Sequence, residues 1–179
     1  MALEDNPKGV REGHLPKSPI NISTSIIMVS DSLSRLGAEW TKKDRSSKIA
    51  EEILEGYGIR QAKINVIPDE KDRVEQETLK SVAEEANLII TIGGTGISIR
   101  DVTVEALSGL FDKELPGFGE LFRAESYKAI GAQALMSRAT AGIRGKSLII
   151  ALPGSPNAVK TGLNVIMPEI HHILGLLNK

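Results

Sequence analysis

The chain lacks cysteine altogether, and this absence excludes several kinds of site at once. Without a thiol there is no disulfide framework, no cysteine nucleophile and no cysteine ligand for zinc. Aromatic residues make up only 3% of the sequence, so few side chains offer a stacking surface for the bases of a single-stranded nucleic acid. The 22 basic and 23 acidic residues nearly cancel, so the overall charge does not favour binding to a polyanion. We therefore expect no nucleic-acid partner.

Long apolar segments are also missing. No stretch approaches the ~20 apolar residues that a membrane-spanning helix needs, and residues 1–19 lack the apolar core of a signal peptide. These absences predict a cytoplasmic protein without a membrane partner. Prolines, glycines and charges dominate residues 1–22, a composition that predicts a flexible N-terminal arm. The remaining residues, 23–179, are predicted to form one α/β domain.

Apolar strands and amphipathic helices alternate along this domain. The strands are predicted at residues 25–29, 62–67, 87–92, 138–143 and 147–152. The helices are predicted at residues 44–58, 74–86, 117–135 with interruptions, from about 102, and from about 156 to the end with a kink at Pro168. The pattern of the helix at 74–86 places Leu79, Val82, Ala83 and Ala86 inward.

This alternation predicts a three-layer, Rossmann-like α/β fold, in which a mostly parallel sheet carries helices on both faces. Ligands of such sheets bind beyond the carboxyl ends of the strands. Candidate functional residues are therefore sought directly after the predicted strands.

A glycine-rich segment, GGTGISIRDVT, follows the strand at residues 87–92. Its backbone can approach a ligand without obstruction by a Cβ, and its successive N–H groups can form an anion-binding concavity. The segment matches neither the dinucleotide fingerprint nor the P-loop, and the alternative is a simple turn in which Asp101 caps the next helix. Its place between a buried strand and a helix favours phosphate binding, by Gly93, Gly94, Thr95 and Gly96.

Two carboxylates can converge on this glycine-rich segment. Asp101 belongs to the segment itself, and Asp69 follows the strand at residues 62–67. Alone, Pro68 and Asp69 would be an ordinary turn. Because the carboxyl ends of parallel strands share one edge of the sheet, the two aspartates can hold one Mg²⁺ against a triphosphate. Arg100 can reach a phosphate from the same segment.

Polar residues follow the other predicted strands. Ser155 and Pro156 have the types preferred at an N-cap and at the first helical position, which predicts both a helix start and an anion site. Asp31 and Ser32 follow the first strand, where a hydrogen-bonded turn is the favoured interpretation. The residue types alone do not decide the roles of Glu120 and Arg138. Glu120 can bind a purine edge or cap a helix, and Arg138 can cross to the glycine-rich segment.

Seven spaced motifs resemble the MogA/MoaB family of molybdopterin adenylyltransferases, and most closely its MoaB branch. In order they are VSDS, DRS, IPDE, TIGGTG…RDVT, LPGFGE, SRATAGI and LPGSP, within residues 25–177. The resemblance implies transfer of AMP from Mg–ATP to the phosphate of molybdopterin, with release of pyrophosphate, during biosynthesis of a molybdenum or tungsten cofactor. It also implies a homotrimer or hexamer, and a molybdate-inserting enzyme as the downstream partner.

The resemblance also implies roles for individual residues. Asp69 and Asp101 would be the catalytic and Mg²⁺-binding pair, which some inactive members of the MoaB branch lack. The implied nucleotide-binding residues are Thr91, Gly93, Gly94, Thr95, Gly96, Glu120, Ser137, Arg138 and Ala139. The implied pterin- or phosphate-binding residues are Asp31, Ser32, Ser46, Gly154, Ser155 and Pro156. Ser47 departs from the pattern, because active members usually carry glycine there.

Two other functions compete with this interpretation. CinA-type nucleotide pyrophosphatases resemble the chain in fold and in the GGTG loop, and a pterin-binding module without catalytic activity is a further alternative. The motifs from LPGFGE to LPGSP oppose the first alternative, and the presence of both Asp69 and Asp101 opposes the second.

Overall fold

A computed structural model describes residues 21–60 and 62–178 of the chain. Of the expected N-terminal arm, only Asn21 and Ile22 lie among these residues. Ile22 is buried in the same hydrophobic cluster as the central strands. The packed part of the molecule therefore extends at least to Ile22, one residue before the predicted start of the domain.

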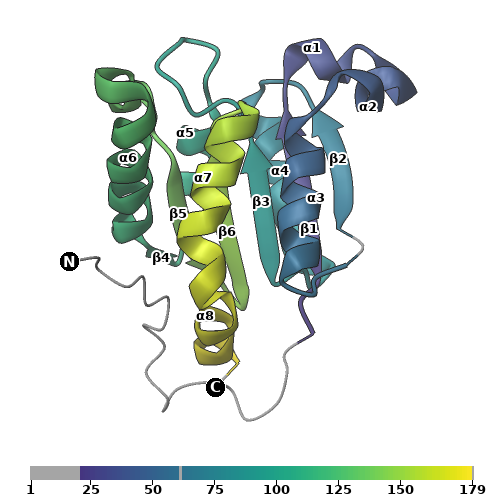
Figure 1. The fold of residues 1–179 in the computed structure, drawn as a ribbon. Coiled ribbons are helices and arrows are strands. Elements are labelled where there is room, and N and C mark those ends of the chain that lie inside the picture. Colours follow the sequence, from purple (N-terminus) through teal and green to yellow (C-terminus); the bar gives the residue numbers. More distant parts are fainter. Residues whose placement is uncertain (1–20, 61, 179) are drawn as a thin grey trace, which may run out of the picture.

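A six-stranded sheet forms the middle layer of the molecule (Figure 1). Its order is β2-β1-β3-β6-β5-β4, in which β2, β1, β3 and β6 are parallel and β5 and β4 are antiparallel to their neighbours. This confirms the predicted mostly parallel sheet, although the short strand β4 was not predicted. The strands are β1 (Thr24–Val29), β2 (Lys63–Ile67), β3 (Leu88–Ile92), β4 (Lys113–Glu114), β5 (Thr140–Arg144) and β6 (Ser147–Leu152).

Helices cover both faces of this sheet, as predicted. In Figure 1, α3, α7 and α8 lie in front of the sheet, α4 and α5 lie behind it, and α6 lies beside β5. No helix in the described part of the chain is long and apolar enough to cross a membrane. The α-helices are α1 (Asp31–Ser34), α2 (Trp40–Lys43), α3 (Ser46–Gly56), α4 (Lys71–Ala83), α5 (Thr103–Ser108), α6 (Pro116–Ile130), α7 (Pro156–Ile166) and α8 (Ile170–Leu177), and 3-10 turns occupy Gly37–Glu39, Gly131–Met136 and Met167–Glu169.

The hydrophobic core consists of two clusters, one on each face of the sheet. Ile26 belongs to the cluster that contains Leu54 of α3 and Leu163 of α7, whereas its neighbour Ile27 belongs to the cluster that contains Val74 of α4. Successive side chains of a strand point to opposite faces, so each fully buried strand must supply apolar residues to both clusters. This explains the unbroken apolar runs of the central strands.

The C-terminal helical segment is interrupted at Pro168, as predicted. Helix α7 ends at Ile166, the 3-10 turn Met167–Glu169 contains the proline, and α8 begins at Ile170. Proline lacks the N–H that a helical hydrogen bond needs, and its ring clashes with the preceding turn.

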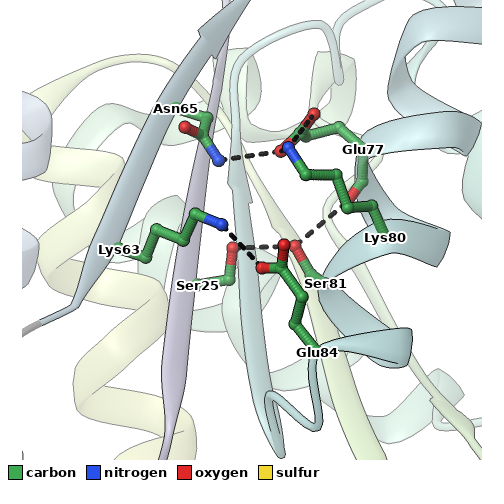
Figure 2. Close-up of polar contacts among 7 residues, drawn as sticks. All are labelled: Ser25, Lys63, Asn65, Glu77, Lys80, Ser81 and Glu84. Atoms are coloured by element: carbon green, nitrogen blue, oxygen red, sulfur yellow. Dashed lines mark hydrogen bonds and ion pairs between the residues drawn. The ribbon is translucent and has the colours of Figure 1, made fainter.

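The predicted orientation of α4 was wrong at two positions. Leu79 is 40% exposed and Ala83 is exposed, whereas Val74, Thr78 and Ser81 face the sheet. Polar contacts join α4 and its C-cap Glu84 to the strands β1 and β2, as Figure 2 shows together with the pair of Lys80 and Glu77 within the helix. The pairs include Ser25 Oγ with Ser81 Oγ at 2.8 Å, Asn65 Nδ2 with Glu77 Oε1 at 2.7 Å, and Lys63 Nζ with Glu84 Oε2 at 2.6 Å.

The buried contact of Ser25 with Ser81 and the partly buried contact of Asn65 with Glu77 favour this orientation of α4. Buried hydroxyl and amide groups are costly unless they are hydrogen-bonded, so the polar side chains of β1 and β2 require polar partners from the helix. Helix α4 therefore turns a partly polar face inward and leaves Leu79 at the surface.

Leu54 is buried and Leu79 is exposed, so the two leucines allow a direct comparison. Leu54→Ala empties a fully buried position, 1% exposed, and is expected to lower the free energy of unfolding by about 2–5 kcal/mol. Leu79→Ala removes an exposed side chain and is expected to cost less than about 1 kcal/mol. Urea-induced unfolding measures both. Equal losses in the two variants would mean that Leu79 packs inward, as its sequence pattern suggested.

Candidate functional site

The carboxyl ends of the four parallel strands lie side by side. Val29 pairs with Ile67, Met28 pairs with Ile92, and Ile92 pairs with Leu152. After β1 the chain enters helices that precede α3 on one face, whereas after β3 it enters α5 on the other face. Such a divergence between adjacent strands opens a crevice, which is where open α/β sheets bind their ligands. The predicted glycine-rich segment follows β3 at this crevice.

The glycines at positions 93 and 94 are required by their surroundings. Their φ angles are 113° and 64°. A methyl group at Gly93 would lie 2.2 Å from the carbonyl oxygen of Val29, and one at Gly94 would lie 2.3 Å from Thr103 Oγ1. Gly93 N donates to Leu152 O at 2.9 Å, and Thr103 Oγ1 donates to Gly93 O at 2.8 Å. The loop is therefore fixed between the ends of β1 and β6 and the start of α5.

The two predicted catalytic aspartates lie at opposite ends of this loop. A methyl group at Gly94 would lie 3.4 Å from Asp69 Oδ1, and one at Gly96 would lie 2.9 Å from Asp101 Oδ2. The negative charge of Asp101 also acts on Asp69. The structure thus brings together the glycine loop and two carboxylates from separate strand ends.

The carboxylate of Asp101 does not cap α5, which was the alternative function considered for it. Its Oδ2 accepts the N–H of Ser98 at 2.8 Å, and Asp101 N donates to Ser98 O at 2.9 Å. The residue at the N-cap of α5 is Val102, which makes no side-chain capping bond. Asp101 therefore closes a turn within the loop.

Asp69 carries an electrostatic penalty in the folded protein. Burial raises the pKa of its carboxyl group above the ordinary value of 3.8, and the negative charges of Asp31 and Asp101 act in the same direction. A hydrogen bond from the backbone of Asp31 and the positive charge of Arg100 partly oppose this rise. A cation beside Asp69 would relieve the penalty.

Arg138 crosses to the glycine loop, a possibility that the sequence left open. Its Nε donates to Gly96 O at 2.8 Å and its Nη2 donates to Asp101 O at 3.1 Å, while its backbone N donates to Thr95 O at 3.0 Å. The guanidinium also forms an ion pair with Glu105 of α5. Because these contacts occupy the guanidinium, Arg138 holds the loop against α5. Arg138 would therefore support nucleotide binding by holding the loop in place, and not by contacting the nucleotide itself.

The predicted phosphate residues after β6 meet the start of α3. Ser46 Oγ donates to Gly154 O at 2.7 Å, and a methyl group at Gly154 would lie 3.7 Å from the Cα atom of Gly93. Ser155 Oγ accepts the N–H of Ala158 at 3.3 Å, and Pro156 is the first residue of α7. The predicted helix start is confirmed, and it lies at the same edge of the sheet as the glycine loop.

Asp44 was not predicted as a site residue, although it organises the start of α3. Its buried carboxylate accepts the N–H groups of Ser46 at 2.9 Å and Ser47 at 3.0 Å, and also the hydroxyl of Ser47. The hydroxyl of Ser47, the residue that departs from the resembled motif, is thus bound to Asp44. An aspartate directly before a helix is a capping signal, so the sequence contained the information that was missed.

A pocket of about 480 Å³ opens beside the glycine loop, between α6 and α7. Its volume lies in the range of small-molecule sites. Thr95 is one of its lining residues. The Thr95 hydroxyl is buried and has no hydrogen-bond partner within the described residues. Other lining residues include Gly96, Phe122, Ser137, Ser155 and Lys160.

The remaining predicted residues lie behind or beside this pocket. Thr91 is fully buried and its hydroxyl donates to Ile150 O at 3.3 Å, and Ala139 is buried. Glu120 is exposed on α6 and is not among the described residues that line the pocket. Ser32 Oγ lies 3.0 Å from Ser30 Oγ in the turn after β1. Phe122 and Lys160 line the pocket but carry no signal in the sequence that would have marked them.

The crowding at Gly93 leads to a matched test of two glycines. Gly93→Ala places a methyl group against a backbone oxygen at a positive φ, so we expect a loss of about 3 kcal/mol or more in the free energy of unfolding. Gly58 also has a positive φ, 76°, but open space where its methyl group would lie. Gly58→Ala should therefore cost only about 1 kcal/mol. Urea unfolding of both variants checks this, and equal losses would contradict the close approach to Val29.

The raised pKa of Asp69 predicts a pH dependence of stability. The folded protein binds this proton more tightly than the unfolded chain, so the stability contributed by Asp69 falls as the pH rises from 3.8 through the raised pKa. Asp69→Asn cannot ionise, so the variant should lack this fall and be at least as stable as the wild type at neutral pH. Urea unfolding over a pH series measures the difference, with Asp112→Asn as a control. A selective loss of stability in Asp69→Asn at neutral pH would show that the carboxylate is stabilising.

Comparison with known proteins identifies the family. Residues 25–172 match the family described as a probable molybdopterin binding domain. A relative from Pyrococcus furiosus named molybdopterin adenylyltransferase is 42% identical over 170 residues, which are 93% of this chain and 96% of that protein. The crystal structure of the tungsten cofactor synthesizing protein MoaB from the same organism has a TM-score of 0.78 at 39% identity, covering 90% of this chain and 100% of that one.

A more distant likeness concerns the fold alone. The crystal structure of the protein CinA from Thermoplasma acidophilum has a TM-score of 0.59 at 17% identity, covering 84% of this chain and 99% of that chain. The family match over residues 25–172, together with 42% identity to a relative, confirms the resemblance that the motifs indicated. The chain belongs to the molybdopterin-binding domain family, with MoaB proteins among its relatives.

Proposed function

We propose that this protein is a molybdopterin adenylyltransferase, which transfers AMP from ATP to the phosphate of molybdopterin and releases pyrophosphate. The name of the relative from Pyrococcus furiosus supports this activity. The observation that carries the proposal is the convergence of the Asp69 and Asp101 carboxylates on the two ends of the glycine loop. The product would serve the biosynthesis of a molybdenum or tungsten cofactor.

Both substrates are phosphorylated, so the site must first overcome their mutual repulsion. Backbone N–H groups of the glycine loop supply donors on one side of the pocket, where Thr95 and Gly96 are lining residues. Ser155 at the start of α7 and the cationic Lys160 lie on another side of the same pocket. We assign the ATP phosphates to the glycine loop and the pterin phosphate to the side of Ser155.

Asp69 and Asp101 suit a shared Mg²⁺ ion. Carboxylate oxygens are its preferred ligands, and the raised pKa of Asp69 reflects unfavourable charge that a cation would relieve. In the described part of the chain no group of three or more His, Asp or Glu side chains is arranged to hold a metal. Phosphate oxygens and water would therefore complete the coordination, so metal and nucleotide are expected to bind together. The bound ion would neutralise charge on the departing pyrophosphate.

The transfer needs little acid–base chemistry from the protein. An oxygen of the pterin phosphate attacks the α-phosphorus of ATP, the bond from that phosphorus to the bridging oxygen breaks, and pyrophosphate leaves. The attacking phosphate is already ionised at neutral pH, so no general base is required. Positioning of the two phosphates and neutralisation of their charge account for catalysis.

Assembly and location follow from the resemblance of the motifs. We expect a homotrimer or hexamer in the cytoplasm, whose product passes to a molybdate-inserting enzyme. The pyrophosphatase alternative is supported by the resemblance of the GGTG loop and by a likeness of fold to the CinA structure.

Replacement of Asp101 is the direct test of the mechanism. In Asp101→Asn we expect intact folding, retained pterin binding and AMP transfer lowered at least ~10²-fold, the scale of losing one preorganised electrostatic element. The assay mixes protein, molybdopterin, ATP and Mg²⁺, and detects adenylylated pterin and pyrophosphate. The control is Asp112→Asn, because Asp112 pairs with Arg144 and Gly145 at the turn before β6, at the opposite edge of the sheet.

Three outcomes would overturn the proposal. Transfer at the wild-type rate in Asp101→Asn would remove this residue from the mechanism. Cleavage of ADP-ribose by the wild type with a divalent metal would favour the pyrophosphatase. Pterin binding without any AMP transfer would favour the inactive binding module.

A further inference from the structure

Asp31 and Asp69 form a reciprocal pair across the edge of the sheet. Asp31 N donates to Asp69 Oδ2 at 2.7 Å, and Asp69 N donates to Asp31 Oδ1 at 3.1 Å. Each carboxylate therefore accepts the backbone N–H of the other residue. The two residues follow β1 and β2, which are neighbours in the sheet, so the pair ties the first two strand ends together.

The pair leaves one oxygen of Asp69 directed at the glycine loop. Its Oδ2 is engaged by Asp31, whereas its Oδ1 is the atom that lies 3.4 Å from the place of a methyl group at Gly94. A carboxylate has one torsion that sets which oxygen points where. The hydrogen bond from Asp31 N fixes this torsion, and the Asp31 carboxylate, by accepting Asp69 N, holds the two backbones at the separation that this bond requires.

Both oxygens of Asp31 are already engaged. Oδ1 accepts from Asp69, and Oδ2 forms an ion pair with Arg100, which extends from the glycine-rich segment. A negative carboxylate with both oxygens occupied repels a phosphate rather than binding it.

We propose that Asp31 is a positioning residue for Asp69, and not the pterin- or phosphate-binding residue that the motif resemblance implied. It aims Asp69 Oδ1 at the glycine loop, where the metal-bound triphosphate is placed, so this inference rests on the proposed function. Arg100 holds the Asp31 carboxylate in place and bridges the loops that follow β1 and β3. The ion pair thus spans the crevice at which the sheet binds its ligand.

The two possible roles of Asp31 make opposite kinetic predictions. A positioning residue acts through the metal ligand, so its loss raises the Mg²⁺ requirement and leaves the KM for molybdopterin unchanged. Loss of an outer partner of a metal ligand weakens metal binding about 10–100-fold. A residue that contacts the pterin phosphate would instead raise the KM for molybdopterin and leave the Mg²⁺ requirement unchanged.

Three variants separate the contacts of Asp31. Asp31→Ala removes both side-chain contacts, Asp31→Asn keeps an oxygen for the Asp69 N–H but loses the charge that pairs with Arg100, and Arg100→Ala removes the ion pair alone. We expect the Mg²⁺ concentration for half-maximal AMP transfer to rise at least about tenfold in Asp31→Ala, and by less in the other two. Excess Mg²⁺ should restore much of the rate. Ser34→Ala is the control, because Ser34 Oγ donates to the backbone oxygen of Asp31 and not to either carboxylate of the pair.

Two measurements make the inference independent of activity. Mn²⁺ binding in the presence of a non-hydrolysable ATP analogue, followed by electron paramagnetic resonance, should weaken in the same order of variants. Hydrogen exchange at the backbone N–H of Asp69 should accelerate in Asp31→Ala and stay slow in Ser34→Ala. If Asp31→Ala does not fold, the nearly isosteric Asp31→Asn carries the Mn²⁺ measurement, in which loss of the charge that pairs with Arg100 should still weaken binding.

The outcomes distinguish this inference from the proposed function. If the wild type transfers no AMP, the proposed function is overturned. The positioning role is still supported if the Asp31 variants bind Mn²⁺ more weakly and Asp31→Ala exchanges the Asp69 N–H faster. Normal transfer in the wild type, with a raised KM for molybdopterin and an unchanged Mg²⁺ requirement in the Asp31 variants, would overturn the positioning role. Unchanged exchange at Asp69 in a folded Asp31→Ala would also overturn it.

Discussion

Gly93 lies so close to the end of β1 that the carbonyl oxygen of Val29 occupies the region of its missing side chain. This close approach lets the loop after β3 cross the edge of the sheet directly, while its N–H is held by Leu152 at the end of β6. A wider turn would lift the loop away from the neighbouring strand ends. The meeting of Asp69 with Gly94 therefore depends on the absence of a Cβ one residue earlier.

The charges around this loop are distributed unequally. Arg100 is paired with Asp31, and Arg138 is paired with Glu105, so two arginines near the loop are engaged by carboxylates outside the proposed catalytic pair. The carboxylate of Asp69 accepts the backbone N–H of Asp31, and burial raises the pKa of this carboxyl group. The folded protein thus concentrates uncompensated negative charge where a divalent cation is proposed to bind, at a cost to its own stability.

The sequence was sufficient for features encoded by neighbouring residues. The strands around Ile26, Ile90 and Ile150, the glycine loop and the start of α7 at Pro156 are local patterns, and all were predicted. The orientation of α4 failed because it depends on hydroxyl and amide groups of β1 and β2, which are distant in the chain. The reciprocal pair of Asp31 and Asp69 was missed for the same reason, since only the folded sheet brings together two turns separated by an entire strand–helix unit.

Motif resemblance has a different limitation, which Thr91, Ala139 and Arg138 illustrate. A motif includes every residue that a loop needs, whether that residue contacts the ligand or supports the residues that do. The Thr91 hydroxyl donates to a backbone oxygen of the neighbouring strand, and Ala139 is buried. The Arg138 guanidinium donates to two carbonyl oxygens of the loop. Ser47 shows the converse: it departs from the motif, yet its hydroxyl is bound to the buried Asp44, so the start of α3 remains ordered. The contacts of each side chain, and not its membership of a motif, therefore separate the residues that form the pocket from those that hold it in shape.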